Sequence, residues 1–281
     1  MRIDISRDPG HTRLVIGTEL IENLVQATAL SHLIKGHKRV SLLLLAAPES
    51  GKTTIATAAT CRHICRVAVI SGRSVIQQAN AHKHFEFFLF NDLSTVRAMS
   101  ASAVNLLVSL LNQVTQDEIG IVAFAGKEVE TISRPLGIIG CMPFDTFVDH
   151  RARWKELGFV SRMIPFAYQY PKVLVATIKD GIDQGHGKSN AVAKQRMPKA
   201  GRRQYQVAMS PALTRQVRNL ADARATTLKQ LGLRLLQNYH CLIRAHALLH
   251  KREAVTREDL DFLRSVDDHV SITECRELDP K

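Results

Sequence analysis

Three consecutive residues, Gly51, Lys52 and Thr53, have the types and spacing of a phosphate-binding loop. An apolar run at residues 42–46 precedes them, and an Ala-rich helical pattern at residues 55–60 follows. In such a loop, backbone N–H groups at the start of the next helix point at phosphate oxygens. The lysine reaches the β- and γ-phosphates, and the following hydroxyl binds Mg²⁺. The stretch therefore predicts a site for ATP and Mg²⁺.

The predicted loop starts at Ala46, a position where this motif most often has glycine. We expect the turn and the first helical residues to contact the nucleotide. These candidate binding residues are Pro48, Glu49, Ser50, Gly51, Lys52, Thr53 and Thr54.

A second apolar run, residues 87–90, ends in Asn91 and Asp92. A strand of this kind delivers one carboxylate to the Mg²⁺ shell and usually a second, adjacent one that polarises the attacking water. If Asn91 holds the metal position, Asp92 stands where the catalytic carboxylate is usual. If Asp92 is the metal ligand, Leu93 follows and no adjacent base exists. In either case Asn91-Asp92 departs from the usual pair of adjacent carboxylates. This departure predicts ATP binding with slow hydrolysis.

The chain of 281 residues has a net charge of +12, which favours polyanionic partners, of which nucleic acid is the commonest. Basic residues are dense at 179–206, a stretch that reads as a linker or mobile loop and a candidate phosphate-contact surface. Residues 120–132 predict a hairpin with Lys127 at its tip. This hairpin could contact DNA or merely extend a sheet.

Apolar runs of membrane-spanning length are missing, and the first residues lack the apolar core of a signal peptide. We therefore expect a cytoplasmic protein without membrane contact. Five cysteines, several in apolar patterns, favour reduced thiols over a disulfide framework. Cys61, His63 and Cys65 could bind a metal, but their expected position on the helix after the loop favours buried helix residues.

The order of patterns predicts an α/β fold: a parallel sheet sandwiched by helices, followed by a small all-helical lid. Helices are expected at 20–34 and 94–117, and further strands at 67–70, 136–142 and 173–178. From Ser210 the pattern is helical, with Pro211 at the first helical position. The expected division is a nucleotide-binding domain at 1–178, a basic linker at 179–206 and a lid at 207–281.

Taken together, the phosphate-binding loop, the strand ending at Asn91-Asp92, a later Ser-Arg and a helical lid resemble the AAA+ ATPases over residues 15–268. The closest local likeness is to the clade with a hairpin before the sensor-1 strand, which includes the minichromosome maintenance helicases and the MoxR-type ATPases. Ser161-Arg162-Met163 looks like the Ser-Arg-Phe arginine finger of that clade. Residues 213–223 look like the lid helix that carries sensor 2, which assigns Arg215 to the γ-phosphate, with Arg218 as its substitute.

The resemblance implies a homo-oligomeric ring or filament with ATP between subunits and Arg162 acting in trans. A plainer interpretation of Arg162 is a surface ion pair. Cys141-Met142-Pro143 stands where a polar sensor-1 residue is usual, and Thr146 is the nearest substitute. The implied work is on DNA, in replication, transposition targeting or mobile-element maintenance. The alternative is a MoxR-like remodeller that acts on a protein partner.

Overall fold

The computed structural model describes residues 17–58, 63–67, 81, 84–116, 122–124, 127–129, 135–183 and 204–279. Six strands form one parallel sheet, which confirms the predicted α/β class. Their order is β2-β3-β6-β1-β7-β8, so β6 lies between β1 and β3. The strands are β1 (Leu42–Ala46), β2 (Ile64–Val67), β3 (Phe87–Phe90), β6 (Gly137–Pro143), β7 (Ile164–Gln169) and β8 (Arg276–Glu277).

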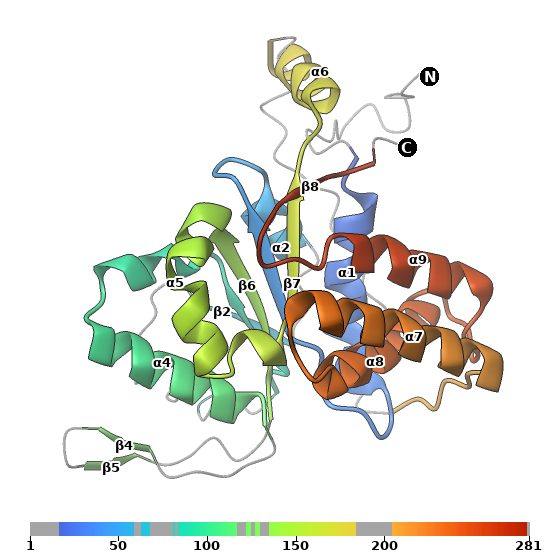
Figure 1. Cartoon of the computed structure of the whole chain (residues 1–281), viewed down its shortest axis with the longest axis horizontal. Helices are drawn as coiled ribbons and strands as arrows, with labels where there is room; N and C mark the ends of the chain where they lie inside the picture. Colours follow the sequence, from blue (N-terminus) through green and yellow to red (C-terminus); the bar gives the residue numbers. More distant parts are fainter. Residues whose placement is uncertain are drawn as a thin grey trace.

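Helices cover both faces of this sheet (Figure 1). One face packs on α1 (Glu19–Leu30), α2 (Lys52–Ala58), α7 (Pro211–Leu228), α8 (Leu233–Leu249) and α9 (Arg257–Asp268). The other packs on the 3-10 helix η2 (Leu93–Ala98), α4 (Ala101–Val114), α5 (Phe144–Glu156) and the 3-10 helix η3 (Val160–Arg162). The short η1 (Ser31–Leu33) continues α1, and α6 (Lys172–Asp183) follows β7.

Strand β1 is apolar throughout because both of its faces are buried. Leu42, Leu44 and Ala46 contribute to the core shared with α1 and the C-terminal helices, whereas Leu43 and Leu45 contribute to the core under α4 and α5. Successive side chains of a strand point to opposite faces, so a strand between two helical layers needs an unbroken apolar run. This requirement explains why the run before the phosphate-binding loop is readable in the sequence.

The C-terminal helices begin at the predicted caps. The Ser210 hydroxyl accepts a hydrogen bond from the Leu213 N–H at 3.3 Å, and Thr256 and Asp259 form a capping box that starts α9. Helices α7, α8 and α9 share one core with α1 and β1. After α9, the chain returns to the sheet as β8, whose Arg276 is in register with Tyr168 of β7.

Three predicted elements are wrong in detail. Residues 173–178 belong to helix α6, and the strand lies earlier, at β7. Cys65 lies on strand β2, not on the helix after the loop. The long helix predicted at 94–117 is divided into η2 and α4, because the Ser100 hydroxyl caps a new helix by accepting from the Ala103 N–H.

The hairpin exists as strands β4 (Val122–Phe124) and β5 (Lys127–Val129), an antiparallel pair separate from the main sheet. Lys127 is in register with Phe124 and starts β5, so it follows the tip and does not occupy it. Most of the basic stretch at 179–206 lies outside the described residues. Within the part that is described, we find no helix long and apolar enough to cross a membrane.

Candidate nucleotide-binding site

The predicted phosphate-binding loop lies at the carboxyl end of β1 and leads into α2. Its turn is tight: Glu49 and Gly51 have φ angles of 61° and 73°. Glycine adopts this left-handed conformation without strain, whereas Glu49 does so at a cost in free energy. The loop therefore has the wrapped backbone that lets successive N–H groups face one anion.

The Lys52 ammonium is held inside this loop. It donates hydrogen bonds to the carbonyl oxygens of Ala46 at 3.0 Å and Ala47 at 2.6 Å, and to the Ser50 hydroxyl at 3.1 Å. Burial lowers the pKa of Lys52, while the nearby Cys141 and Asp92 oppose that shift. All three acceptors are neutral, so a triphosphate would offer this buried cation its first anionic partners within the loop.

Two tyrosines hold the loop in place from the side. Tyr168 lies on β7, and Tyr170 directly follows the last residue of that strand. The Tyr168 and Tyr170 hydroxyls both donate to the Ser50 carbonyl, at 3.1 and 3.0 Å. Burial raises the pKa of Tyr168, and it raises that of Tyr170 to about 12, so both phenols stay protonated donors at neutral pH. Neither tyrosine was predicted to contact the loop, although a Tyr-Gln-Tyr alternation at the end of an apolar run was a usable signal.

We predict that Tyr168→Phe or Tyr170→Phe alone weakens ATP binding about threefold or less, because the Ser50 carbonyl keeps one donor. The double variant leaves this carbonyl without a phenol donor and should lose more than the product of the two single effects. Titration calorimetry with an ATP analogue measures all three constants. Strictly multiplicative effects would show that the two hydroxyls do not share the task.

The residue after the lysine connects the loop to two other strands. The Thr53 hydroxyl donates to the Asn91 main-chain oxygen at 3.0 Å, and it lies near the Cys141 thiol, whose pKa it lowers. Asn91 follows β3, and Cys141 is near the end of β6. Burial raises the pKa of Cys141 to about 12, so this residue is a neutral thiol at the position predicted for a polar sensor. Thr146, the predicted substitute, is buried on α5.

Asp92 lies close enough to Lys52 to influence its charge, but its carboxylate is already engaged. One oxygen accepts from the Ser94 N–H and the other from the Ser94 hydroxyl, both at 2.7 Å. Asp92 is thereby the N-cap of η2. A carboxylate that serves as a cap is a weaker candidate for polarising water, since part of its hydrogen-bonding capacity is used.

The residues here fit a magnesium ion that arrives with a nucleotide. The Asn91 side-chain oxygen is buried and, among the described residues, has no hydrogen-bond partner. The main-chain oxygen of the same residue accepts from the Thr53 hydroxyl, so Asn91 and Thr53 adjoin each other beside the loop. Within the described residues no group of three His, Cys, Asp or Glu side chains could hold a metal. Mg²⁺ retains waters and is commonly held through substrate phosphates, which suits such a sparse set of ligands.

The two predicted arginines are not part of this cluster. Arg162 ends η3, just before β7. It therefore lies at the amino ends of the parallel strands, whereas the loop lies at their carboxyl ends. Its guanidinium donates to the Gly158 carbonyl. Arg215 is exposed in α7, which packs against α8 and α9, and its side chain makes no hydrogen bond or ion pair with another residue of the part of the chain that the structure describes. Both remain predictions.

No family model and no curated protein matches the chain. A solved structure from Cytophaga hutchinsonii, described as a "putative ATPase", is 13% identical, with a TM-score of 0.49, and the match covers 92% of this chain and 82% of that one. The parallel sheet and the loop after β1 define an α/β protein with the P-loop NTPase fold.

Proposed function

We propose that this protein binds ATP with Mg²⁺ at the loop after β1 and hydrolyses it slowly. The observation that carries the proposal is the position of Lys52, buried inside its own loop and bonded only to neutral oxygens there. A buried ammonium favours an anionic partner strongly, and the wrapped backbone supplies additional N–H donors for the same anion.

Slow turnover follows from the groups next to the loop. Mg²⁺ would neutralise charge on the β- and γ-phosphates. Thr53 and Asn91 would contact the ion or its waters, and Asn91 would contribute no negative charge. Asp92 would be the base that orients water, but Ser94 engages both of its oxygens. The chain therefore supplies strong phosphate binding and weak activation of the nucleophile.

The wider proposal is an AAA+ type assembly, a ring or filament in which Arg162 of one copy approaches the nucleotide of the next and Arg215 senses the γ-phosphate. Its target would be DNA, which the net charge of +12 favours. The runner-up is a MoxR-like remodeller with a protein target. Stimulation of hydrolysis by DNA, falling steeply with salt, would separate the two because phosphate contacts release counterions.

The direct test is ATP binding by Lys52→Ala. We expect a loss of affinity of about 100-fold or more, since a charge-assisted contact to phosphate and a central donor disappear together. Equilibrium titration with a fluorescent ATP analogue gives the constants. Lys155→Ala, which removes a lysine bonded to the Leu228 carbonyl, is a control that should bind as wild type does. Unchanged binding by Lys52→Ala would refute the site.

A further inference from the structure

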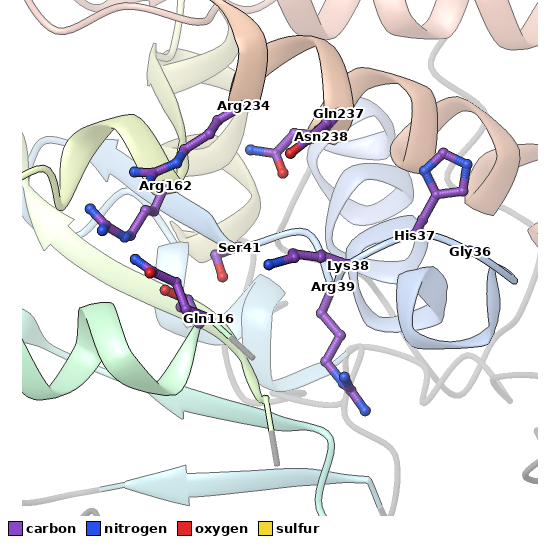
Figure 2. Close-up of a pocket in the computed structure, with 11 residues that line it drawn as sticks. Gly36, His37, Lys38, Arg39, Ser41, Gln116, Arg162, Arg234, Gln237 and Asn238 are labelled. Carbon is purple, nitrogen blue, oxygen red and sulfur yellow. The ribbon is translucent and has the colours of Figure 1, made fainter. Parts of the chain in front are cut away.

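A group of basic side chains lies between the segment that precedes β1 and the helices α7 and α8. His37 belongs to that segment, Arg218 to α7, and His240 and Arg244 to α8. Figure 2 shows the His37 side chain directed toward α8. Because His37 precedes β1 by only a few residues, the group lies at the amino ends of the strands, away from the phosphate-binding loop. We call these four residues the basic cluster.

Arg244 is held in place by neutral groups alone. Its Nε donates to the Val207 carbonyl at 3.1 Å, and its Nη1 donates to the His240 carbonyl at 2.8 Å. The remaining nitrogen, Nη2, makes no hydrogen bond with another residue of the part of the chain that the structure describes. Burial lowers the pKa of Arg244, and the Cys241 thiol opposes that shift, with no contribution from a described carboxylate. Arg244 is therefore a half-buried cation with an oriented donor and no anionic partner among the described residues.

The two imidazoles experience the same excess of positive charge. Burial and the other three members of the basic cluster lower the pKa of His240 to about 4. Burial, followed by Arg244, lowers the pKa of His37. No Asp or Glu of the described residues contributes to either shift, so both rings are neutral at pH 7. The Arg244 Nη1 lies 3.4 Å from the His240 Nδ1 and can only donate, which leaves the His240 proton on Nε2.

Arg218 completes the basic cluster from the solvent side. It is exposed on α7, and within the described residues its side chain has neither a hydrogen bond nor an ion pair. It lies close enough to His240 to lower the pKa of that imidazole. Two guanidinium groups therefore lie around one neutral imidazole, and their mutual repulsion would fall if an anion entered between them.

We propose that the basic cluster binds a phosphate group of a nucleic-acid backbone, with Arg218 and Arg244 as binding residues and the His240 Nε2 as a further donor. Planar guanidinium groups suit phosphate oxygens because they donate two parallel hydrogen bonds. This assignment rests on the nucleic-acid target proposed above and names the contact that the target would make.

The position of the basic cluster in the chain favours a polyanion over a single small phosphate. The basic stretch at 179–206 ends beside it, since the Tyr205 carbonyl accepts from the Lys35 N–H at 2.9 Å, and Arg244 holds the carbonyl of Val207. Arg202 and Arg203 come shortly before these residues in the sequence. A backbone with many phosphates could use such consecutive cations, whereas one isolated phosphate could not.

The experiment is binding of a fluorescently labelled DNA duplex, followed by anisotropy at several salt concentrations. We expect Arg218→Gln to weaken binding about tenfold and to reduce the slope of log K against log salt by about one, because one phosphate contact is lost. The loss should be equal for duplexes of different sequence. Arg97→Gln is the control: it removes the same charge from η2, on the other face of the sheet, where Arg97 pairs with Asp149. It should change the affinity less than about twofold.

Arg244→Gln should weaken binding in the same way, and thermal unfolding checks that each variant is folded. The pH gives a second readout. An anion beside His240 raises the pKa of the imidazole, so binding takes up a proton and is tighter at pH 5.5 than at pH 7.5, while the phosphodiesters stay ionised. The charged or titratable groups that act on His240 are Arg244, His37 and Arg218. His240→Gln should reduce the gain in affinity by about threefold or more.

Two results would overturn this assignment, and they differ in what they leave standing. If the wild type binds the duplex but Arg218→Gln and Arg244→Gln match Arg97→Gln in affinity and salt slope, the contact lies elsewhere and the DNA target stands. If the wild type binds no duplex, the DNA target and this contact fall together. ATP binding at the loop is judged separately, by the Lys52→Ala titration.

Discussion

An equal mixture of Arg162→Ala and Lys52→Ala chains is expected to regain about a quarter of the wild-type ATPase rate per chain, while each variant alone is nearly inactive. In a head-to-tail assembly, a working site needs a loop from an Arg162→Ala chain and an arginine from a Lys52→Ala chain. Each requirement is met by half of the chains in a random mixture. Steady-state phosphate release measures the rate.

The geometry explains why recovery requires two chains. Lys52 follows β1 and Arg162 precedes β7, and these strands are adjacent and parallel, with Leu42 in register with Ile164. The six residues of β7 span about 20 Å. Arg162 and Lys52 of one chain therefore lie near opposite ends of these adjacent strands. If Arg162 acts on a nucleotide, that nucleotide belongs to another copy.

A mixture of Lys52→Ala with Thr53→Ala is the matched control. Both changes damage the same loop, so no arrangement of the two chains restores an intact site, and the rate should stay at the level of either variant. Full activity of Arg162→Ala alone would contradict the trans role. A mixture that co-assembles but stays inactive would contradict it as well.

The second large effect concerns stability. Asp267→Ala should lower the free energy of unfolding by about 3–5 kcal/mol, because removing one partner leaves a buried charge uncompensated. Asp267 accepts from the Arg224 guanidinium at 3.1 and 2.9 Å and also from the Tyr239 hydroxyl. These contacts join α7, α8 and α9, and both charged side chains are at most 11% exposed.

Urea unfolding followed by circular dichroism measures this loss. Asp261→Ala is the control: it makes the same substitution on the same helix, but its pairs with Arg257 and Arg264 are exposed, and it should cost less than about 1 kcal/mol. Because α7–α9 share a core with α1 and β1, we expect a single transition that shifts as a whole. Two separate transitions, of which only one moves, would contradict the shared core.

Strands buried on both faces and capped helices were predictable from the sequence, since an apolar run or a Ser-Pro start leaves a local signal. The elements around β7 were not. Pro165 interrupts the appearance of a strand at residues 164–169, whereas the β-branched residues of 173–178 imitate one. The exposed Val173, with 74% of its surface accessible, shows that this segment is not a buried strand.

Within the site, the loop residues were readable because their spacing is local. The hydrogen bonds from Tyr168 and Tyr170 to Ser50 span about 120 positions of the chain, and that from Arg234 to Ser161 spans 73. Such contacts depend on strand order and helix docking, which no local pattern records. Asn91 and Asp92 were located correctly, but the engagement of Asp92 by Ser94 became visible only in the structure.

Strand β7 links the loop after β1 to the opposite end of the sheet. Tyr168 near its carboxyl end contacts the loop, and Arg162 just before its amino end lines a cavity between η3 and α8. Four residue pairs in register with β1 prevent the strand from sliding along its neighbour. The separation of the two ends is therefore constant, and in any stack of copies joined end to end it would set the repeat distance. A nucleotide that changes such a stack would do so by tilting one copy on the next, without stretching either.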